Sequence, residues 1–241
     1  MLSPIATGVL GAAGAVGVAA GGYAYAALWP GSQIFGKAMT APRRSAELAL
    51  TFDDGPNPAW TPKLLETLAE HDIRASFFLM GSRAQGQPAL VRRLVEAGHL
   101  IGNHSWSHPN LAGTAASKVR RELAQTKDVL EQIAGVPVKY FRPPFGARRP
   151  AVFRIARELG MTVVLWNAMT NDWSEPSEDR IAAALMEKID GLERRGYAAN
   201  IVLHDGGHLD PEAARGPSVM AAGVLSARYA RTHRFVTLAE W

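Results

Sequence analysis

Two adjacent carboxylates, Asp53 and Asp54, lie in the stretch Thr-Phe-Asp-Asp-Gly-Pro at residues 51–56. They follow an apolar run and precede a Gly-Pro turn. Neighbouring side chains of a strand point to opposite faces of a sheet, and like charges side by side are unfavourable. A bound cation would offset the repulsion, because one carboxylate can hold the cation while its neighbour stays free as a base. The pair therefore indicates a cation site at a strand end.

His104 and His108 form a His-x-x-x-His pattern in a second polar cluster, at residues 103–109. Imidazole nitrogen is the commonest protein ligand of zinc, and this spacing recurs in metal sites. The pair alone is equally well explained as two loop or N-cap histidines. With an aspartate from another strand, two histidines leave coordination positions open, as a catalytic metal needs. The same ligands also suit cobalt, nickel or other divalent ions.

The elements that must position these side chains are predicted as strands and helices in alternation. Short apolar runs indicate seven strands, at residues 46–54, 74–81, 99–106, 138–145, 161–168, 199–206 and 234–240. Amphipathic patterns indicate helices, at residues 61–71, 88–99, 116–135, 150–160, 177–191 and 218–233, with Ser177 as an N-cap. This alternation predicts a parallel sheet with covered faces, and closure into a barrel is favoured over an open sheet.

Polar clusters fall at or just after the C-terminal ends of five predicted strands. They are Asp53 with Asp54, and residues 103–109, 142–146, 171–173 and 204–206. In parallel α/β barrels this rim is where active sites form. Five clusters on one rim are hard to explain by solvation alone, so we predict a catalytic site there.

Each of these residues also has a structural explanation when it is taken alone. Arg142 could be a surface residue on a rigid Pro-Pro segment, and Asp172 could cap a turn. Trp106 and Trp173 could belong to the core. His204 ends an apolar run and could be a core histidine whose hydrogen bonds are satisfied. Only the convergence of the clusters favours the functional interpretation.

The motifs TFDDGP, HSWSH, RPPFG, NDW and VLHDG, in this order, resemble those of the polysaccharide deacetylases, carbohydrate esterase family four with its NodB-homology domain. The resemblance covers about residues 45–241. Each motif alone is modest, but all five in order are highly specific. The resemblance implies an α/β fold, a distorted (β/α)7 barrel of the glycoside hydrolase–deacetylase type. It also implies metal-dependent removal of N- or O-acetyl groups from sugars.

The same resemblance implies a metal set and a base. Asp54, His104 and His108 would hold the metal, zinc (Zn2+) by family resemblance, with Co2+ as an alternative. Asp53 would be the general base, because a metal lowers the pKa of bound water and a poised carboxylate can take its proton. Arg142 would pair with Asp53 and fix its position.

Further roles follow from the resemblance on the other side of the reacting bond. The metal and the backbone N–H of Phe145 would stabilise the developing oxyanion. His204 would be the general acid that protonates the leaving amine. Asp172 would keep His204 charged and oriented, since a nearby carboxylate raises the pKa of a histidine.

Substrate contacts are also implied. Trp173, Val202 and Leu203 would line a pocket for the acetyl methyl group, and Pro143 is a further predicted substrate contact. Phe145 stands where the family commonly has a tyrosine, so a substrate contact through the hydroxyl would be lost.

A second departure concerns the acid that pairs with His204. Asn167 and Asn171 occupy the neighbourhood where the family often has an additional acid before Asp-Trp, which leaves the pairing of His204 open.

The remaining histidines have weaker contexts. His71, His99 and His233 have no polar motif around them, and we interpret them as structural. His208 lies near the rim after Gly206-Gly207, and we interpret it first as part of a flexible loop and second as a substrate contact.

Composition limits the classes of function. The chain has 241 residues, of which 47% are hydrophobic and 20% charged, with a formal net charge of +4, as in ordinary globular domains. No Lys/Arg block with interleaved aromatic residues stands out, so we predict no nucleic-acid partner. Cysteine is absent, which excludes disulfides, thiolate metal sites and a cysteine nucleophile.

The first 40 residues differ from the rest, and we predict a hydrophobic segment at 1–40 and a catalytic domain at 41–241. Residues 1–36 carry no charged side chain. The stretch 5–29 is long enough to span a bilayer, with interfacial aromatic residues near one end. It lacks the basic start of a secretory signal. We interpret it as a membrane anchor or uncleaved signal; the alternative is a Gly/Ala-rich helix or flexible tail.

Localisation is predicted in two ways that conflict. A glycan substrate favours the cell envelope, with the protein membrane-anchored or exported. Lys37, Arg43 and Arg44 after the hydrophobic segment would instead place the domain on the cytoplasmic side of a membrane, by the positive-inside rule.

Three hypotheses for function result. The first is a metal-dependent deacetylase of an N-acetylated glycan, such as peptidoglycan or chitin oligomers. The second is a deacetylase or deformylase of a lipid-linked sugar, or an amidase for a small amide. The third is a non-catalytic glycan-binding module, although binding alone needs neither a base nor an acid. A glycosidase is disfavoured, because adjacent carboxylates do not flank a glycosidic bond.

Overall fold

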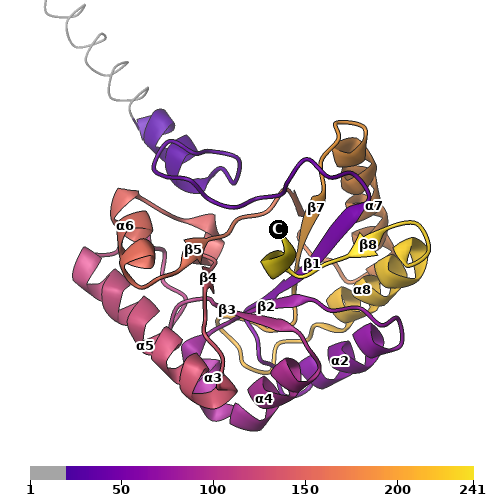
Figure 1. Ribbon diagram of the computed structural model, residues 1–241, viewed down its shortest axis with the longest axis horizontal. Helices are drawn as coiled ribbons and strands as arrows, with labels where there is room; N and C mark the ends of the chain where they lie inside the picture. Colours follow the sequence, from indigo (N-terminus) through magenta and orange to yellow (C-terminus); the bar gives the residue numbers. More distant parts are fainter. Residues whose placement is uncertain (1–19) are drawn as a thin grey trace, which may run out of the picture.

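The computed structural model describes residues 20–241. Its strands form one sheet, and every pair of neighbouring strands in it is parallel. The order of the strands across the sheet is β5-β4-β3-β2-β1-β7-β6, and β8 also pairs with β1 (Figure 1). The strands are β1 (Glu47–Asp53), β2 (Ser76–Leu79), β3 (Leu100–Asn103), β4 (Tyr140–Phe141), β5 (Thr162–Val163), β6 (Ala168–Met169), β7 (Ala199–His204) and β8 (Arg234–Phe235). Parallel strands need crossover connections, and helices supply most of them.

Helices surround the sheet (Figure 1). They are α2 (Thr61–Ala69), α3 (Gly81–Gly86), α4 (Pro88–Glu96), α5 (Ala116–Ala134), α6 (Pro150–Glu158), α7 (Glu178–Glu193) and α8 (Gly216–Tyr229), with the short 3₁₀ helices η1 (Pro144–Gly146) and η2 (Leu238–Glu240). Their apolar faces pack on the sheet in one large core cluster. The predicted N-cap is confirmed, since Ser177 Oγ accepts a hydrogen bond from Arg180 N–H at 3.3 Å. The predicted distorted α/β barrel is confirmed as well.

The register aligns the strand ends that carry the polar motifs. In the ladder between β1 and β7, Asp53 is opposite His204, and on the other side of β1 it is opposite Phe78. Asn103 at the end of β3 is opposite Phe141 at the end of β4. The motifs that follow these strands therefore start at the same edge of the sheet, as the C-terminal rim of a barrel requires.

A segment that precedes the sheet fills the gap between its two ends. Within the described chain β5 and β6 do not pair with each other, and residues 29–42, here called the strap, bond to β5 and Leu165 on one side and to the start of β7 on the other. Four hydrogen bonds make the connection: Met39 N–H to Val163 O at 2.9 Å, Leu165 N–H to Met39 O at 2.8 Å, Ala198 N–H to Pro42 O at 3.0 Å, and Asn200 Nδ2 to Thr40 O at 2.8 Å. The predicted boundary between residues 40 and 41 thus falls inside the strap.

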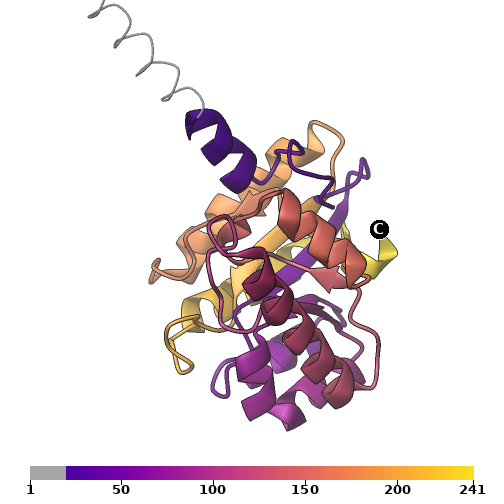
Figure 2. The ribbon, with the colours of Figure 1, turned by 90° about the vertical axis from the view of Figure 1, so that its left-hand side faces the viewer.

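A buried arginine fastens the residues before the strap to the barrel. Residues 20–28 are helical and lie at the outer edge of the domain in both views (Figures 1 and 2). Arg148 is fully buried, and its guanidinium donates to the carbonyls of Ala27, Trp29, Ser32 and Gly146. A cation at the end of a helix also complements the partial negative charge of its last carbonyls. Arg148 therefore caps this helix and holds the start of the strap.

The predicted membrane segment at 5–29 lies mostly outside the described residues. Among residues 20–241, no helix combines the length and apolarity that crossing a bilayer needs.

Some strands are shorter than predicted for identifiable reasons. The run at 138–145 pairs only at Tyr140–Phe141, because Pro143 and Pro144 have no N–H for a ladder. The run at 161–168 is divided into β5 and the first residue of β6, and the strap pairs with the part in between. The helix α3 and the two 3₁₀ helices are additions that periodicity does not reveal.

Candidate metal centre and acid–base site

At the site, several residues have backbone φ angles that residues with a side chain rarely adopt. Asp54, Ser105, His108 and Phe145 all have left-handed backbone, with φ of +70°, +65°, +56° and +58°. For residues with a side chain this costs about 1–2 kcal/mol each. The turn at Asp54 breaks the alternation of the strand, so Asp53 and Asp54 both line one pocket. The local structure thereby brings two neighbouring carboxylates to the same side.

Asp54, His104 and His108 are buried and close together. Each offers one ligand atom, and these atoms lie within 4.8 Å of one another. Asp54 Oδ1 is 3.4 Å from His104 Nε2 and 3.1 Å from His108 Nε2. His104 Nδ1 lies 2.8 Å from the carbonyl oxygen of Arg142, an acceptor, which places the proton on Nδ1 and leaves Nε2 free toward Asp54. The structure brings together the three residues of the predicted metal set.

The protonation states suit a divalent cation. Burial opposes the charge of Asp54, but the neighbouring imidazoles of His104, His108 and His208 hold its pKa well below the usual value. Burial lowers the pKa of His108, which favours the neutral, ligating form. In the described chain, Asp54 Oδ1 is buried without a hydrogen-bond donor. An orphaned carboxylate oxygen beside two imidazoles is the donor set of a catalytic metal with open positions, so these residues fit a divalent cation.

Asp53 is held by a buried arginine. Arg142 Nη1 donates to Asp53 Oδ1 at 2.8 Å and to Thr51 Oγ1 at 2.7 Å, and Nη2 donates to Asn200 Oδ1 at 3.2 Å. The guanidinium carbon lies 4.1 Å from the ring centroid of Phe78. Asp53 Oδ2 is 3.9 Å from His104 Nε2. One oxygen of Asp53 is therefore fixed, and the other lies beside the metal set.

His204 and Asp172 form the predicted pair on another side of the pocket. His204 Nδ1 is 2.9 Å from Asp172 Oδ1, and the backbone N–H of His204 donates to Asp172 Oδ2 at 2.8 Å. Ser218 Oγ donates to the same oxygen at 2.7 Å. Burial by itself lowers the pKa of His204, but the Asp172 carboxylate outweighs it and raises that pKa to about 9. His204 is therefore protonated at neutral pH.

A pocket of about 350 Å³ contains these groups. Its lining residues are Asp53, Asp54, His104, His108, Phe145, Trp166, Met169, Trp173, Val202, His204, His208 and Arg215. The ring of Trp173 stands edge-on to His204 with centroids 5.3 Å apart, and the ring of Phe145 stands edge-on to His108 at 4.5 Å. Trp173 and Val202 therefore line the pocket, and their contact with an acetyl methyl group stays a prediction. An oxyanion role for the backbone N–H of Phe145 stays a prediction.

Two predicted substrate contacts lie elsewhere. Leu203 is fully buried in the large core cluster and does not line the pocket. It follows Val202 in β7, and consecutive strand residues face opposite sides of a sheet. Pro143 is buried directly before η1 and is not in the lining either.

His208 belongs to the pocket, and its loop is fastened at several points. The His208 ring stacks on His108 with centroids 4.4 Å apart, and His208 Nδ1 is 3.7 Å from Asp54 Oδ2. Arg83 donates to the carbonyls of Gly207 and His208, and Arg215 donates to that of Gly206. The interpretation as a flexible loop is therefore replaced by that of a pinned loop beside the metal set.

Several residues that support the site lie outside the sequence motifs and were not predicted. Glu122 of α5 accepts hydrogen bonds from the backbone N–H groups of Trp106 and Ser107, and so fixes the loop between the two ligating histidines. Asn200 is a polar residue inside the apolar run of β7, which is a signal that could have marked it. Thr51 lies two residues before Asp53, on the same face of β1. Ser218 has no comparable signal in the sequence.

The three histidines interpreted as structural lie outside the pocket. His99 is buried and accepts a hydrogen bond from Ala75 N–H at 3.1 Å, and burial lowers its pKa to about 4. His233 pairs with Glu193.

Known proteins share this fold and these motifs. A family profile described as "Polysaccharide deacetylase" matches residues 40–164. A peptidoglycan-N-acetylglucosamine deacetylase of Bacillus cereus is 41% identical over 144 residues, which are 60% of this chain and 52% of that protein. A chitooligosaccharide deacetylase of Sinorhizobium fredii is 36% identical over 158 residues, 65% of this chain and 71% of that protein. The chain thus spans about half the length of the Bacillus relative.

A solved structure gives the same assignment for the fold. The structure of a family 4 acetyl xylan esterase from Clostridium thermocellum, in complex with a cobalt ion, aligns with a TM-score of 0.70 at 31% identity. The alignment covers 80% of this chain and 89% of that one. With the profile match over residues 40–164, these similarities place the chain in the polysaccharide deacetylase family.

Proposed function

We propose that this protein hydrolyses the N-acetyl group of an N-acetylated glycan of the cell envelope, such as peptidoglycan or chitin oligomers, with a divalent metal ion. The observation that carries the proposal is the shared pocket of three groups: the ligand set of Asp54, His104 and His108, the carboxylate of Asp53 and the charged His204. A binding module would need neither of the last two. The names of the relatives in Bacillus and Sinorhizobium support the substrate class.

The proposed reaction needs one group that accepts a proton from the attacking water and a second group that donates a proton to the leaving nitrogen. When bound, the metal supplies a Lewis acid that polarises the acetyl carbonyl and acidifies water. Asp53 accepts the proton of the attacking water on Oδ2, while Arg142 keeps Oδ1 in place. His204 gives the proton on Nε2 to the leaving nitrogen, and Asp172 holds its Nδ1. One water is consumed, and acetate and a free amine leave.

Two finer assignments are part of the proposal. We assign zinc as the metal, because two histidines and one carboxylate are ligands that zinc accepts, and cobalt is the alternative. We assign the N-terminal segment to a membrane, because residues 1–36 are uncharged and the side chains of Tyr25 and Trp29 are exposed. Membrane fractionation of the full chain tests the second assignment.

The experiment is acetate release from N-acetylglucosamine oligomers and from peptidoglycan by the full chain, with added zinc and with chelator. We expect release that chelator abolishes and that falls by at least about a hundredfold in Asp53→Asn, the scale of general-base catalysis. Asp128→Asn, an exposed aspartate on α5, is the matched control and keeps full activity.

Other outcomes are equally informative. Stoichiometric zinc binding without release from either substrate would contradict the glycan proposal and direct attention to lipid-linked sugars and small amides. Neither binding nor release would overturn the catalytic proposal and favour a glycan-binding module.

A further inference from the structure

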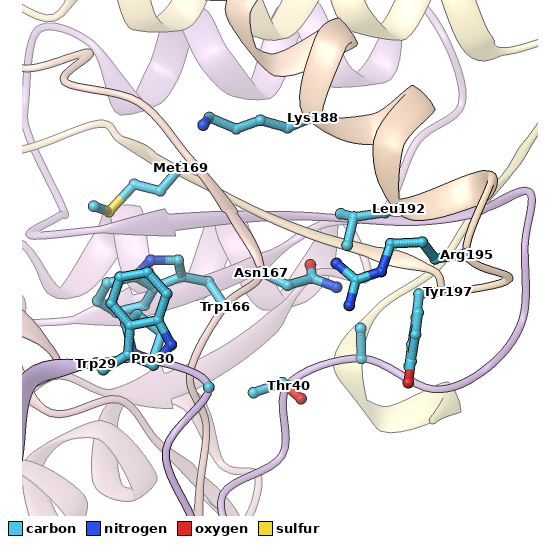
Figure 3. Close-up of a pocket in the computed structure, with 12 residues that line it drawn as sticks. Trp29, Pro30, Thr40, Trp166, Asn167, Met169, Lys188, Leu192, Arg195 and Tyr197 are labelled. Carbon is cyan, nitrogen blue, oxygen red and sulfur yellow. The ribbon is translucent and has the colours of Figure 1, made fainter. Parts of the chain in front are cut away.

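A second cleft has a volume of about 660 Å³, and Figure 3 shows the residues that line it. Trp166 and Met169 line both cavities, so the two cavities share part of their walls. The strap forms one wall of the second cleft with Trp29, Pro30, Gly31, Thr40 and Ala41, and the end of α7 with the residues after it forms the other. A ligand longer than the first pocket would meet this cleft on the side of Trp166 and Met169.

The charges of the two cavities differ. The metal pocket contains Asp53 and Asp54, whereas none of the residues that line the second cleft is acidic. Lys188 and Arg195 line it instead, and within residues 20–241 neither forms an ion pair. Figure 3 shows Lys188 extending from α7 along the Met169 side, while Arg195 lies beside Asn167 and Tyr197. The cleft thus presents two free cations from different directions.

The side-chain amide of Asn167, which lies beside Arg195, is already hydrogen-bonded. Asn167 Nδ2 donates to the carbonyl of Ala198 at 2.9 Å, and Asn167 Oδ1 accepts from the N–H of Asn200 at 2.8 Å. Asn167 therefore holds the wall together, and Lys188 and Arg195 remain as the charged donors for a ligand. Cations with three and five donors are suited to carboxylate oxygens.

Flat apolar surfaces complete the cleft. Trp29 is 59% exposed, and its ring stacks on that of Tyr25 with centroids 6.3 Å apart and planes at 16°. Tyr197 lies at the opposite end from Trp29 and Trp166 (Figure 3). Aromatic faces beside a few polar groups are typical of sites for amphipathic ligands such as sugars.

We propose that this cleft binds a carboxylate-bearing substituent on the sugar next to the one that loses its acetyl group, so that the enzyme prefers acidic over neutral glycans. The proposal rests on the proposed function. Lys188 and Arg195 contact the carboxylate, and the strap contributes the aromatic face. Neither cation belongs to the five motifs of the rim, so the preference is set by the strap and α7 rather than by the catalytic groups.

The test compares two substrates in the full chain: peptidoglycan fragments with carboxylates on their lactyl-peptide substituents, and neutral N-acetylglucosamine oligomers of equal length. We expect the ratio of kcat/KM, acidic over neutral, to fall about tenfold in Lys188→Gln/Arg195→Gln, through KM and not through kcat. The matched control is Lys118→Gln/Arg121→Gln on α5, which changes the net charge equally at exposed positions outside both cavities. It keeps the ratio of the wild type.

Fragments whose carboxylates have been amidated keep their shape but lose their charge. We expect the wild type to show no preference for these fragments over neutral oligomers. An equal fall in both double variants, or a preference that survives amidation, would overturn the proposal. A direct measurement of binding tests this proposal independently of the proposed function. Calorimetry with Asp53→Asn measures the affinity for an acidic fragment, which falls in the added Lys188→Gln/Arg195→Gln variant whether or not the wild type releases acetate. An affinity that is the same in both proteins would also overturn the proposal.

Discussion

At the level of single residues, Asp172 controls the proton on His204. The folded pKa of His204, about 9, lies above its usual 6.5. The pair therefore stabilises the fold fully below about pH 6.5, and this contribution is lost as the pH rises through about 9. A general acid must be protonated, so the rate should fall over the same alkaline range.

The first prediction is that Asp172→Asn moves the alkaline limb of kcat to lower pH by at least about one unit, because burial then lowers the pKa of His204 without a carboxylate to offset it. Asp179→Asn, exposed in the first turn of α7, is the control. The check is a pH profile of acetate release. An alkaline limb at the same pH in Asp172→Asn would show that His204 is not the acid.

The second prediction concerns Ser218, which acts through Asp172. Ser218→Ala removes one of the donors to the carboxylate and should lower the free energy of unfolding by about 1.5–3 kcal/mol, as for hydrogen bonds to charged groups. The alkaline limb should also shift. Ser226→Ala on the same helix is a matched control, since among residues 20–241 the Ser226 hydroxyl donates to the carbonyl of Ala222 and makes no hydrogen bond with Asp172. A shifted pH profile in both variants would mean that α8 merely loosens.

At the level of elements, the N-terminal helix and strap depend on Arg148. Its four backbone acceptors come from Ala27, Trp29, Ser32 and Gly146. The third prediction is that Arg148→Met lowers the free energy of unfolding by about 3 kcal/mol and opens residues 29–42 to proteolysis, because buried carbonyls lose their donors.

The neighbouring Arg149 supplies the comparison for this prediction. Within residues 20–241 its guanidinium donates to one carbonyl, that of Thr114, so Arg149→Met should cost about 1 kcal/mol or less and leave the strap protected. Chemical denaturation and limited proteolysis measure both effects. Equal protection of the strap in the two variants would contradict the role given to Arg148.

Much of this architecture could be predicted from the sequence, and the failures have physical reasons. Apolar runs located β1 and β7, and the motif spacing located Asp54, His104 and His108. The strap was missed because it contributes only backbone atoms to the four hydrogen bonds that join it to residues 163–200, more than a hundred positions away, so its own side chains carry no pattern. Leu203 was misplaced for a simpler reason: alternation in β7 allows only one of two neighbours to face the pocket.

For the whole molecule, the metal should act as a stabilising ligand. A ligand at a thousand times its Kd adds about 4 kcal/mol to the free energy of unfolding, which for a chain of this size raises Tm by about 10 °C. The fourth prediction is that zinc gives such a shift in the wild type, and that His104→Gln abolishes it.

His99→Gln is the comparison, because His99 is equally buried but lies outside the metal set. It should lower Tm and still respond to zinc. Thermal unfolding with and without chelator measures this. A zinc shift that persists in His104→Gln would place the metal elsewhere.

The strap also has a consequence for the order in which the chain becomes structured during synthesis. Met39 leaves the ribosome before any of its partners, yet it bonds to Val163 and Leu165, and Pro42 bonds to Ala198. Contacts over such separations carry a large loop-closure cost and form slowly. The strap is therefore made before its partners and seated only after them. Until Ala198 and Asn200 have been translated, it stays accessible to the machinery that inserts or exports nascent chains.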